Sequence, residues 1–212
     1  MNTYHKIQSL YKRDPKTNYK TLLEGEYSLP EFEYLKDNIW EYSEKVDGTN
    51  VRTMFDGEAI KFGGKTDKAQ MQVSLLNALN DMFLPKIDTF KEMFPGLAEE
   101  DVNVCLYGEG YGPKINKGGK YRKDHSFVLF DVKIGSWWLK RDDIEGIAKN
   151  LGIDVVPIIG KGTLGELAEM VRKGFLSRWG NFIAEGIVAR PKIELKARNG
   201  ERIITKLKHK DF

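Results

Sequence analysis

The segment Glu44-Lys45-Val46-Asp47-Gly48-Thr49-Asn50 decides how this chain is interpreted. Residues 39–45 before the Asp-Gly pair are typical of a strand, and residues 49–55 after it are typical of a second one. Asp47-Gly48 favours a type I′ hairpin turn, because both residues tolerate the positive φ angles of that turn. We therefore predict an antiparallel hairpin that holds Lys45 at the end of its first strand.

Outside this segment the chain alternates short strands with short helices. It has 212 residues, of which 41% are hydrophobic and 31% charged, an ordinary globular composition. Turn signals at Asp56-Gly57 and Asn199-Gly200 predict further hairpins, and residues 1–26 predict only a short helix or an arm. We expect strands at 59–62, 102–108, 127–132, 153–159, 184–190, 193–197 and 203–209, and helices at 30–38, 70–83, 85–94, 142–151 and 163–173. Strands paired in hairpins with helices between them indicate a mostly antiparallel α+β fold.

The composition also excludes several classes of protein. Cys105 is the only cysteine, so an internal disulfide is excluded and a reducing, cytoplasmic compartment is expected. One cysteine and three histidines give no zinc-site spacing. The apolar runs are far shorter than a membrane span, and no secretory signal peptide is expected.

The net charge of +3 conceals three basic segments. Lysines and arginines outnumber acids by four in each of residues 1–20, 112–124 and 191–212. A single basic segment is usually a solvated loop. Three of them on an otherwise acidic chain suggest a polyanionic partner, such as nucleic acid or nucleotide phosphate.

Lys45 is a candidate nucleophile. A free lysine is mostly protonated at neutral pH, and nearby cations or partial desolvation release its lone pair. Lys206 and Lys208 lie two apart in the last predicted strand, so both point to one face. If that face meets Lys45, the three ammonium groups form a site for a phosphate. Taken singly, each lysine is more typical of a solvated strand end.

Two acids and one aromatic residue complete the candidate set. Glu109 ends a strand between glycines that leave space beside it, and Glu185 opens the apolar strand 185–190. Acids in such places bind ribose hydroxyls or a hydrated magnesium ion. Strand alternation puts Phe127, Leu129 and Asp131 on one face and Phe130 on the other, so one phenylalanine is core and the other could stack on a purine.

These residues in this order resemble the covalent nucleotidyltransferase superfamily of ATP-dependent RNA and DNA ligases and mRNA capping enzymes. The resemblance runs from about residue 39 to the C-terminus. Its elements are Lys45-x-Asp47-Gly48-x-Asn50, Lys65, Glu109, Phe127-x-x-Phe130-Asp131, Glu185-Gly186-x-Val188 and Lys206-x-Lys208. Asn50 and the Gly64-Lys65-Thr66 element make the chain most similar to RNA ligases of the T4 RNA ligase 2 type.

The resemblance implies a fold and a reaction. The fold is one nucleotidyltransferase (ATP-grasp-like ligase) domain over residues 1–212, with two mostly antiparallel sheets and flanking helices. Lys45 attacks the α-phosphate of ATP, forming lysyl-AMP. AMP then passes to an RNA 5′-phosphate, and a 3′-hydroxyl displaces it. Mg²⁺, or Mn²⁺ in its place, supports the chemistry.

The resemblance also implies a role for each residue. Lys45, Lys206 and Lys208 are catalytic, the latter two at the α-phosphate. The nucleotide is contacted by Glu44 (through its backbone, beside the adenine), Asn50, Lys65, Glu109 (ribose), Phe127 (adenine stacking) and Glu185, which also contacts the hydrated metal. We further assign the basic loop Lys114–Lys123 and the basic N-terminus to RNA-backbone contacts, without a motif behind that assignment.

Two departures from the family pattern bear on the substrate. Lys65 stands where arginine is usual, and lysine cannot offer a bidentate fork. The family's C-terminal accessory domain is not expected here, and the compact architecture suggests a viral or phage enzyme by analogy. DNA nick ligation stays open as the closest alternative. Capping-type guanylyl transfer and a non-catalytic nucleic-acid-binding module are further ones. The sequence does not determine the oligomeric state.

Overall fold

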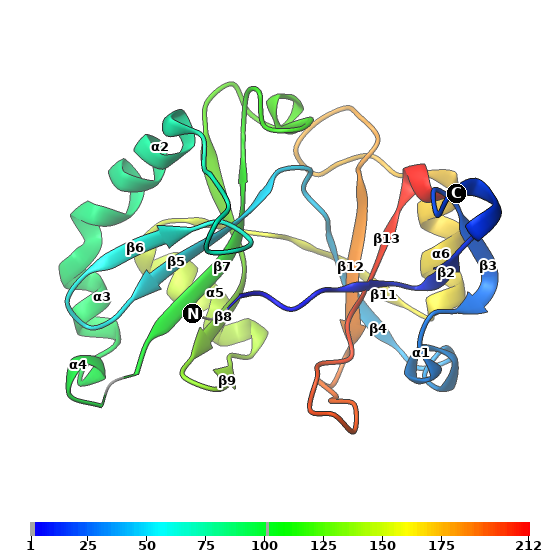
Figure 1. Cartoon of the computed structure of the whole chain (residues 1–212), viewed down its shortest axis with the longest axis horizontal. Coiled ribbons are helices and arrows are strands. Elements are labelled where there is room, and N and C mark those ends of the chain that lie inside the picture. The colour runs from blue at the N-terminus through cyan, green and yellow to red at the C-terminus, as the bar shows by residue number, and fades with distance from the viewer. Residues whose placement is uncertain (1–2, 101) are drawn as a thin grey trace. The chain divides into compact units, whose positions relative to one another are not determined.

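The computed structural model describes residues 3–100 and 102–212 and divides them into two compact units. The first unit comprises residues 47–156 with Thr3 and Tyr4. The second comprises residues 5–46 and 157–212. The chain passes from the second unit to the first directly after Val46, inside the segment that carries the candidate nucleophile (Figure 1).

The first unit is built on one sheet whose strands run in the order β10-β8-β7-β5-β6, with β9 added to β8. All neighbours are antiparallel except β10, which runs parallel to β8. The strands are β5 (Thr49–Phe55), β6 (Ile60–Gly63), β7 (Val104–Tyr111), β8 (Ser126–Ile134), β9 (Trp137–Trp138) and β10 (Asp154–Val155). The predicted Asp56-Gly57 hairpin joins β5 to β6, with Gly57 at a φ of 97°.

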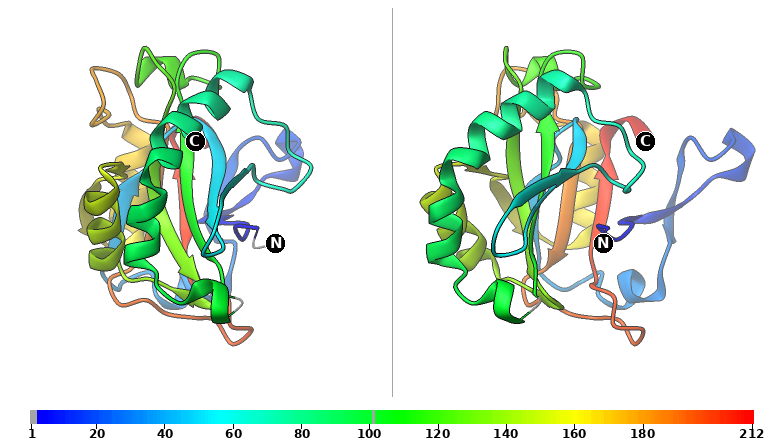
Figure 2. Two further views of the ribbon diagram at one scale, coloured as in Figure 1. Left: turned by 90° about the vertical axis from the view of Figure 1, so that its left-hand side faces the viewer. Right: turned by 60° about the vertical axis from the view of Figure 1, so that its left-hand side comes forward.

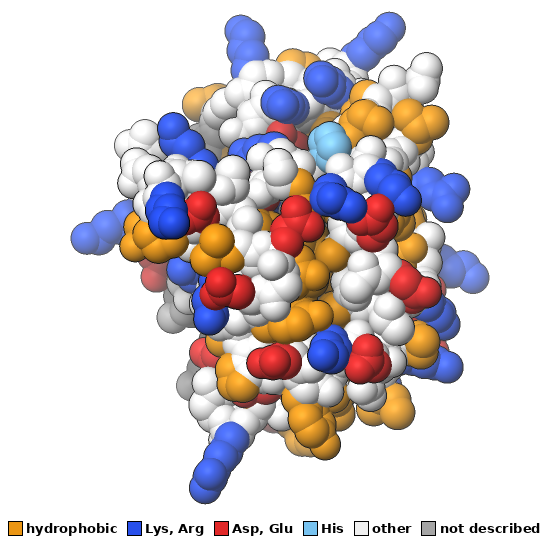
Figure 3. Space-filling model, turned by 90° about the vertical axis from the view of Figure 1, so that its right-hand side faces the viewer, with side chains coloured by type: hydrophobic (Ala, Val, Ile, Leu, Met, Phe, Trp, Pro, Cys, Tyr) orange, Lys and Arg blue, Asp and Glu red, His pale blue; other side chains and the backbone are white. Residues whose placement is uncertain are grey.

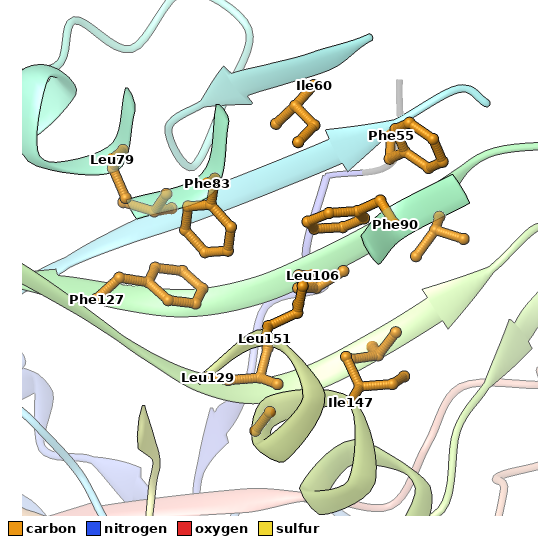
Figure 4. Close-up of a cluster of buried hydrophobic side chains, with 14 of the residues drawn as sticks. Phe55, Ile60, Leu79, Phe83, Phe90, Leu106, Phe127, Leu129, Ile147 and Leu151 are labelled. Carbon is orange, nitrogen blue, oxygen red and sulfur yellow. The ribbon is translucent and has the colours of Figure 1, made fainter. Parts of the chain in front are cut away.

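Helices cover one face of this sheet and bury the core of the unit. They are α2 (Val73–Phe83), η2 (Leu84–Lys86), α3 (Ile87–Met93), α4 (Leu97–Glu100) and α5 (Arg141–Leu151), with η3 (Gly118–Lys120) in the basic loop. Leu75, Leu79 and Phe83 recur at helical spacing in α2 and are fully buried. They meet Phe127 and Leu129 of β8 in a cluster with α3 and α5 (Figure 4). Figure 2 shows these helices along the sheet.

The second unit has its own sheet, in the order β1-β13-β12-β4-β11. Only β1 runs parallel to its neighbour. The strands are β1 (Gln8–Ser9), β4 (Trp40–Glu44), β11 (Ile158–Gly162), β12 (Gly186–Pro191) and β13 (Thr205–Lys208). A separate hairpin pairs β2 (Tyr11–Arg13) with β3 (Leu22–Tyr27) around η1 (Pro15–Thr17).

Helices α1 (Pro30–Tyr34) and α6 (Leu164–Lys173) pack within the second unit, and η4 (His209–Asp211) follows β13. A capping box starts α6, in which the side chains of Thr163 and Glu166 each form a hydrogen bond with the backbone of the other residue. Its buried residues Leu167 and Val171 join Ile187 and Leu207 in the core. The α+β class and the mostly antiparallel pairing are thus confirmed.

The predicted hairpin at Asp47-Gly48 is wrong. The strand before it, β4, pairs with β12 and β11, while the strand after it, β5, pairs with β6 and β7. Gly48 is not among the glycines with positive φ, so the segment is no type I′ turn. Local turn propensity does not determine the conformation here, because β4 and β5 each pair with strands that are distant in sequence and belong to different sheets. The Asp-Gly pair is a connection between two sheets.

Two further predictions are corrected. A short helix or an arm was expected at the N-terminus; from Thr3 to Tyr27 the chain forms β1 and the β2–β3 hairpin, with the short turn η1 inside the hairpin and no α-helix. Residues 193–197 form no strand, because only one bridge, between Lys196 and Arg202, spans the Asn199-Gly200 turn. Among the described residues, no helix combines the length and apolarity that a bilayer span requires.

Candidate active site

Lys45 directly follows β4, where its backbone N–H donates to the carbonyl of Gly186 at 3.0 Å. This bond extends the β4–β12 pairing by one step and fixes the main chain of the lysine. The ammonium group donates to Glu185 Oε2 at 2.8 Å and to the Val46 carbonyl at 3.4 Å. The Lys45 side chain is 21% exposed, so an incoming group can reach it.

Lys208 approaches the same carboxylate from β13. Its Nζ lies 2.7 Å from Glu185 Oε1, so one carboxylate joins two lysines, each through a different oxygen. We call Lys45, Glu185 and Lys208 the lysine cluster. Glu185 is only 8% exposed, and a nearly buried carboxylate needs such partners. With two cations and one anion, the cluster is a net positive site suited to a phosphate.

Lys206 lies on the same face of β13 as Lys208. Leu207 between them is buried in the core with α6, so strand alternation turns both lysines to the opposite face. Lys206 pairs with Val188 of β12, and Lys208 pairs with Gly186. The expected meeting of the Lys206–Lys208 face with Lys45 is thus found directly for Lys208, through Glu185.

Gly186 makes this arrangement sterically feasible. A Cβ on residue 186 would lie 1.9 Å from the carbonyl oxygen of Leu207 and 2.8 Å from the Cα of Lys208. Only glycine lets β12 and β13 approach so closely at this point. Because Gly186 adjoins Glu185 in sequence and Lys208 across the sheet, its small size sets the geometry of the lysine cluster.

The side chain of Glu44 is held inside the second unit, and the contact of its backbone with adenine stays a prediction. Its side chain is buried, accepting hydrogen bonds from Ser177 Oγ at 2.5 Å and from the Arg178 backbone at 2.7 Å. Burial raises the pKa of this carboxyl, and the two hydrogen bonds oppose the rise. Glu44 therefore fastens the 177–179 loop to the end of β4. Sequence reasoning missed Ser177 and Arg178, which stand in no recognisable motif.

In the first unit, Asp47 and Gly48 are held against the end of β7. The Gly48 N–H donates to Glu109 Oε1 at 3.2 Å, and the Asp47 N–H donates to Tyr121 Oη at 3.2 Å. A Cβ on Gly48 would lie 2.3 Å from the Gly110 carbonyl oxygen. Gly48 is thus required for close approach to β7. Tyr121 comes from the basic loop and was not predicted.

Asn50 lies opposite Glu109 in the β5–β7 ladder. Its Oδ1 is buried without a hydrogen-bond partner, although buried amide oxygens are normally paired. It lines a hollow of about 230 Å³ whose polar rim includes Gln72, Lys114 and Asn116. An unpaired buried acceptor beside a hollow is suited to a donor on a bound molecule.

Lys65 is exposed in the loop after β6. The loop is braced by Arg52, a fully buried residue whose Nε donates to the Gly64 carbonyl at 2.7 Å. A second guanidinium nitrogen of Arg52 lies 2.8 Å from Asp67 Oδ1. The burial of Arg52 was not predicted, because a charged residue in an alternating strand is normally expected to face solvent.

Phe127 lies in the helix-covered core, fully buried, with its ring edge-on to Phe83 at 5.3 Å between centroids (Figure 4). It has no exposed face on which a purine could stack. The predicted alternation also fails beyond Leu129. Tyr107 pairs with Asp131 and Gly108 with Leu129, which leaves Phe130 as the extra residue of a β-bulge. Asp131 therefore leaves the core face and accepts a hydrogen bond from Tyr4 Oη at 2.7 Å.

The candidate residues thus lie together in two groups, one in each unit. The second unit brings Lys45, Glu185 and Lys208 together, with Lys206 on the same face. The first unit brings Gly48, Glu109 and Asn50 together. Phe127 belongs to neither group. Across residues 3–100 and 102–212, His, Cys, Asp and Glu nowhere gather in the threes that would form a protein-only metal cage.

A family model described as RNA ligase matches residues 38–208, most of the chain and all of the candidate residues. The chain belongs to the RNA ligase family. This membership confirms the assignment drawn from the motifs, whereas the T4 RNA ligase 2 subtype stays a prediction. Comparison of this RNA ligase family member with curated proteins finds no match.

Solved structures of a Naegleria gruberi RNA ligase have the same fold as this family member. Its structure with pyrophosphate gives a TM-score of 0.64 at 19% identity, covering 98% of this chain and 56% of that one. A mutant with AMP and Mn gives 0.65 at 17%, with the same coverages. Another mutant, with ATP and Mn, gives 0.62 at 19%, covering 100% and 63%. The chain thus spans little more than half the length of these relatives.

Proposed function

We propose that this family member is an ATP-dependent enzyme that joins RNA 5′-phosphate and 3′-hydroxyl ends through lysyl-AMP. The observation that carries the proposal is the lysine cluster, in which a main-chain-anchored lysine and a second lysine share one nearly buried carboxylate. The Naegleria relatives support it, because their structures hold ATP, AMP and pyrophosphate, which are the substrate, transferred group and leaving group of such a reaction.

In the first step Lys45 is the nucleophile. Its ammonium group loses a proton to solvent, and the free amine attacks the α-phosphorus of ATP. The N–P bond forms as the bond from phosphorus to the bridging oxygen of pyrophosphate breaks, and the nitrogen loses a second proton. Lys206 and Lys208, on one face of β13, stabilise the negative charge on the α-phosphate oxygens.

Glu185 is the internal counterion of the two lysines. A phosphate oxygen near Lys208 competes with Glu185 Oε1 for the same ammonium group, since both are anionic acceptors. When Lys208 turns to phosphate, Glu185 keeps one oxygen free. Before the nucleotide binds, the carboxylate offsets the repulsion between the two lysines. When the nucleotide binds, Glu185 loses its ion pair with Lys208.

The residues fit a magnesium ion carried by the nucleotide. Mg²⁺ in nucleotide sites is held mainly by phosphates and water, with one or two protein carboxylates, and Glu185 supplies one. When bound, the ion neutralises phosphate charge and assists departure of pyrophosphate. The exchange of partners at Lys208 makes a Glu185 oxygen available to the ion's hydration shell.

The remaining candidates keep supporting roles in the proposal. Glu109 binds ribose from the end of β7, where its Oε1 also accepts a hydrogen bond from the Gly48 N–H. Asn50 offers its unpaired Oδ1 to a donor on the nucleotide or to metal-bound water. Lys65 contacts phosphate or ribose from the loop that Arg52 braces. Phe127 is left out, because it is fully buried.

In the later steps AMP passes from Lys45 to the 5′-phosphate of one RNA end. The 3′-hydroxyl of the other end then attacks that phosphorus and expels AMP. Each step exchanges one phosphorus bond for another, so no further energy source is needed.

The test is covalent labelling with α-labelled ATP and Mg²⁺, followed by denaturation. We expect retained label in the native protein and none in Lys45→Ala. The matched control is Lys161→Ala, because Lys161 also pairs with an acid, Glu41, in the same sheet. Absence of an adduct in the native protein, or an adduct in Lys45→Ala, refutes the mechanism.

The acceptor is tested next with 5′-phosphorylated RNA and DNA strands, free and nicked. Joining of RNA supports the proposal. Joining of DNA alone replaces it with DNA nick ligation, and label from GTP but not ATP replaces it with guanylyl transfer.

A further inference from the structure

A hollow of about 390 Å³ lies in the second unit beside the end of β13. Its lining is almost entirely charged, and we call it the basic hollow. The lining residues are Arg13, Lys20, Lys208, Lys210 and Asp211. Figure 3 shows a view in which Lys and Arg side chains gather on the surface with acids between them.

The hollow is formed by two segments far apart in sequence. Arg13 ends β2 and Lys20 follows η1, so both come from the β2–β3 hairpin. Lys208 and Lys210 come from the end of β13 and from η4. The Arg13–Asp211 ion pair, at 2.6 Å, joins the segments, and Asp211 is 4% exposed.

Arg13 is positioned by more than this ion pair. Its Nη1 donates to the carbonyl oxygens of Tyr19 at 3.1 Å and Lys20 at 3.3 Å. Those contacts shape the loop before Lys20, where Asn18 and Tyr19 both take positive φ angles, 55° and 59°. A loop held in this uncommon conformation keeps the backbone of Lys20 beside the hollow, while its side chain is exposed.

Charge favours a multiply anionic ligand. Four cationic side chains line the hollow against one acid, and that acid is already paired with Arg13. Lys20 and Lys210 are exposed. Lys208 belongs both to the hollow and to the lysine cluster. A phosphate held by Lys20 and Lys210 is therefore next to the proposed α-phosphate site.

We propose that the basic hollow binds backbone phosphates of the RNA strand that receives AMP. This inference rests on the proposed function and adds a substrate-strand subsite to it. Exposed lysines around an open hollow suit the phosphates of a polymer, which are contacted at the surface by flexible cations. Pyrophosphate carries the same chemistry, and the experiment below separates the two sources.

The test compares Lys20→Gln/Lys210→Gln with Lys91→Gln/Lys149→Gln. All four lysines are exposed, both variants lose two charges, and Lys91 and Lys149 lie outside the hollow and outside the three basic segments. Binding of a fluorescent 5′-phosphorylated single-stranded RNA is measured by anisotropy across a salt series. This readout needs no catalysis, so it is independent of whether the ligase reaction occurs.

The hollow variant is expected to bind RNA about fivefold more weakly, as the loss of two exposed ionic contacts implies. The slope of log affinity against log salt should fall by about 1.4, from two phosphate contacts on a single strand. Lys45 labelling by ATP should be unchanged, while AMP transfer to RNA slows. Equal RNA binding by both variants overturns the proposal. Slower labelling by ATP with unchanged RNA binding also overturns it and assigns the hollow to pyrophosphate.

Discussion

Gly186→Ala is the substitution whose effect the structure specifies most closely. The new Cβ would lie 1.9 Å from the Leu207 carbonyl oxygen. This is about 1.4 Å inside the ~3.3 Å at which carbon and oxygen make favourable contact. The obstacle is backbone in a central strand pair, β12 with β13, so it cannot rotate away as a flexible side chain would.

Overpacking against backbone should lower the free energy of unfolding by about 3 kcal/mol. For a chain of this length that corresponds to a fall of about 6–12 °C in the thermal midpoint. Circular dichroism followed on heating measures it. Because residue 186 adjoins Glu185 and pairs with Lys208, labelling of Lys45 by ATP should also fall at temperatures where the variant is still folded.

The matched control is Gly146→Ala in the interior of α5, where a Cβ would meet nothing within 4 Å. Alanine is the better helix former, so the control should gain about 1 kcal/mol, or about 2–4 °C. If Gly186→Ala lowers the thermal midpoint by less than about 2 °C, the close approach of β12 and β13 does not require glycine at position 186, and the reasoning fails.

Three further predictions follow from the site. Glu185→Gln should slow lysyl-AMP formation at least about tenfold, because Lys45 and Lys208 lose their shared counterion; unchanged labelling in a rapid-quench assay would refute that role. Phe127→Leu should lower stability to chemical denaturation by about 1–2 kcal/mol and leave the KM for ATP unchanged, whereas a raised KM at full stability would restore the stacking role. Burial raises the pKa of Glu44 above 4.5, so the folded form holds this proton more tightly than the unfolded form. Stability should therefore fall, relative to Glu44→Gln, as the pH rises from 4.5 through the folded pKa, and a pH-independent difference in urea denaturation would contradict this.

The sequence predicted well those features that depend on local pattern. The helices expected at 70–83 and 163–173 are found as α2 and α6, and alternation placed Lys206 and Lys208 on one face. Motif order led to the RNA ligase family, which the match over residues 38–208 confirms.

Features that depend on distant partners were not predictable in this way. Asp47-Gly48 resembles a hairpin turn, and only the competing pairing with β12 and β7 reveals a connection between sheets. The bulge at Phe130 is set by the register against β7 rather than by the residue itself. The buried Arg52 is stabilised by acceptors, such as the Gly64 carbonyl, that are brought to it by folding.

The role found for Gly48 has a consequence for engineering. Its lack of a side chain is required by Gly110, 62 positions further along, and its N–H is held by Glu109 while its carbonyl accepts from Asn116 at 2.5 Å. The short Lys-x-Asp-Gly motif is therefore not a portable module. Grafting these residues alone into another protein would transfer the motif without β7, the strand whose contacts determine its conformation. An exchange between ligases should transfer the motif and residues 107–116 together.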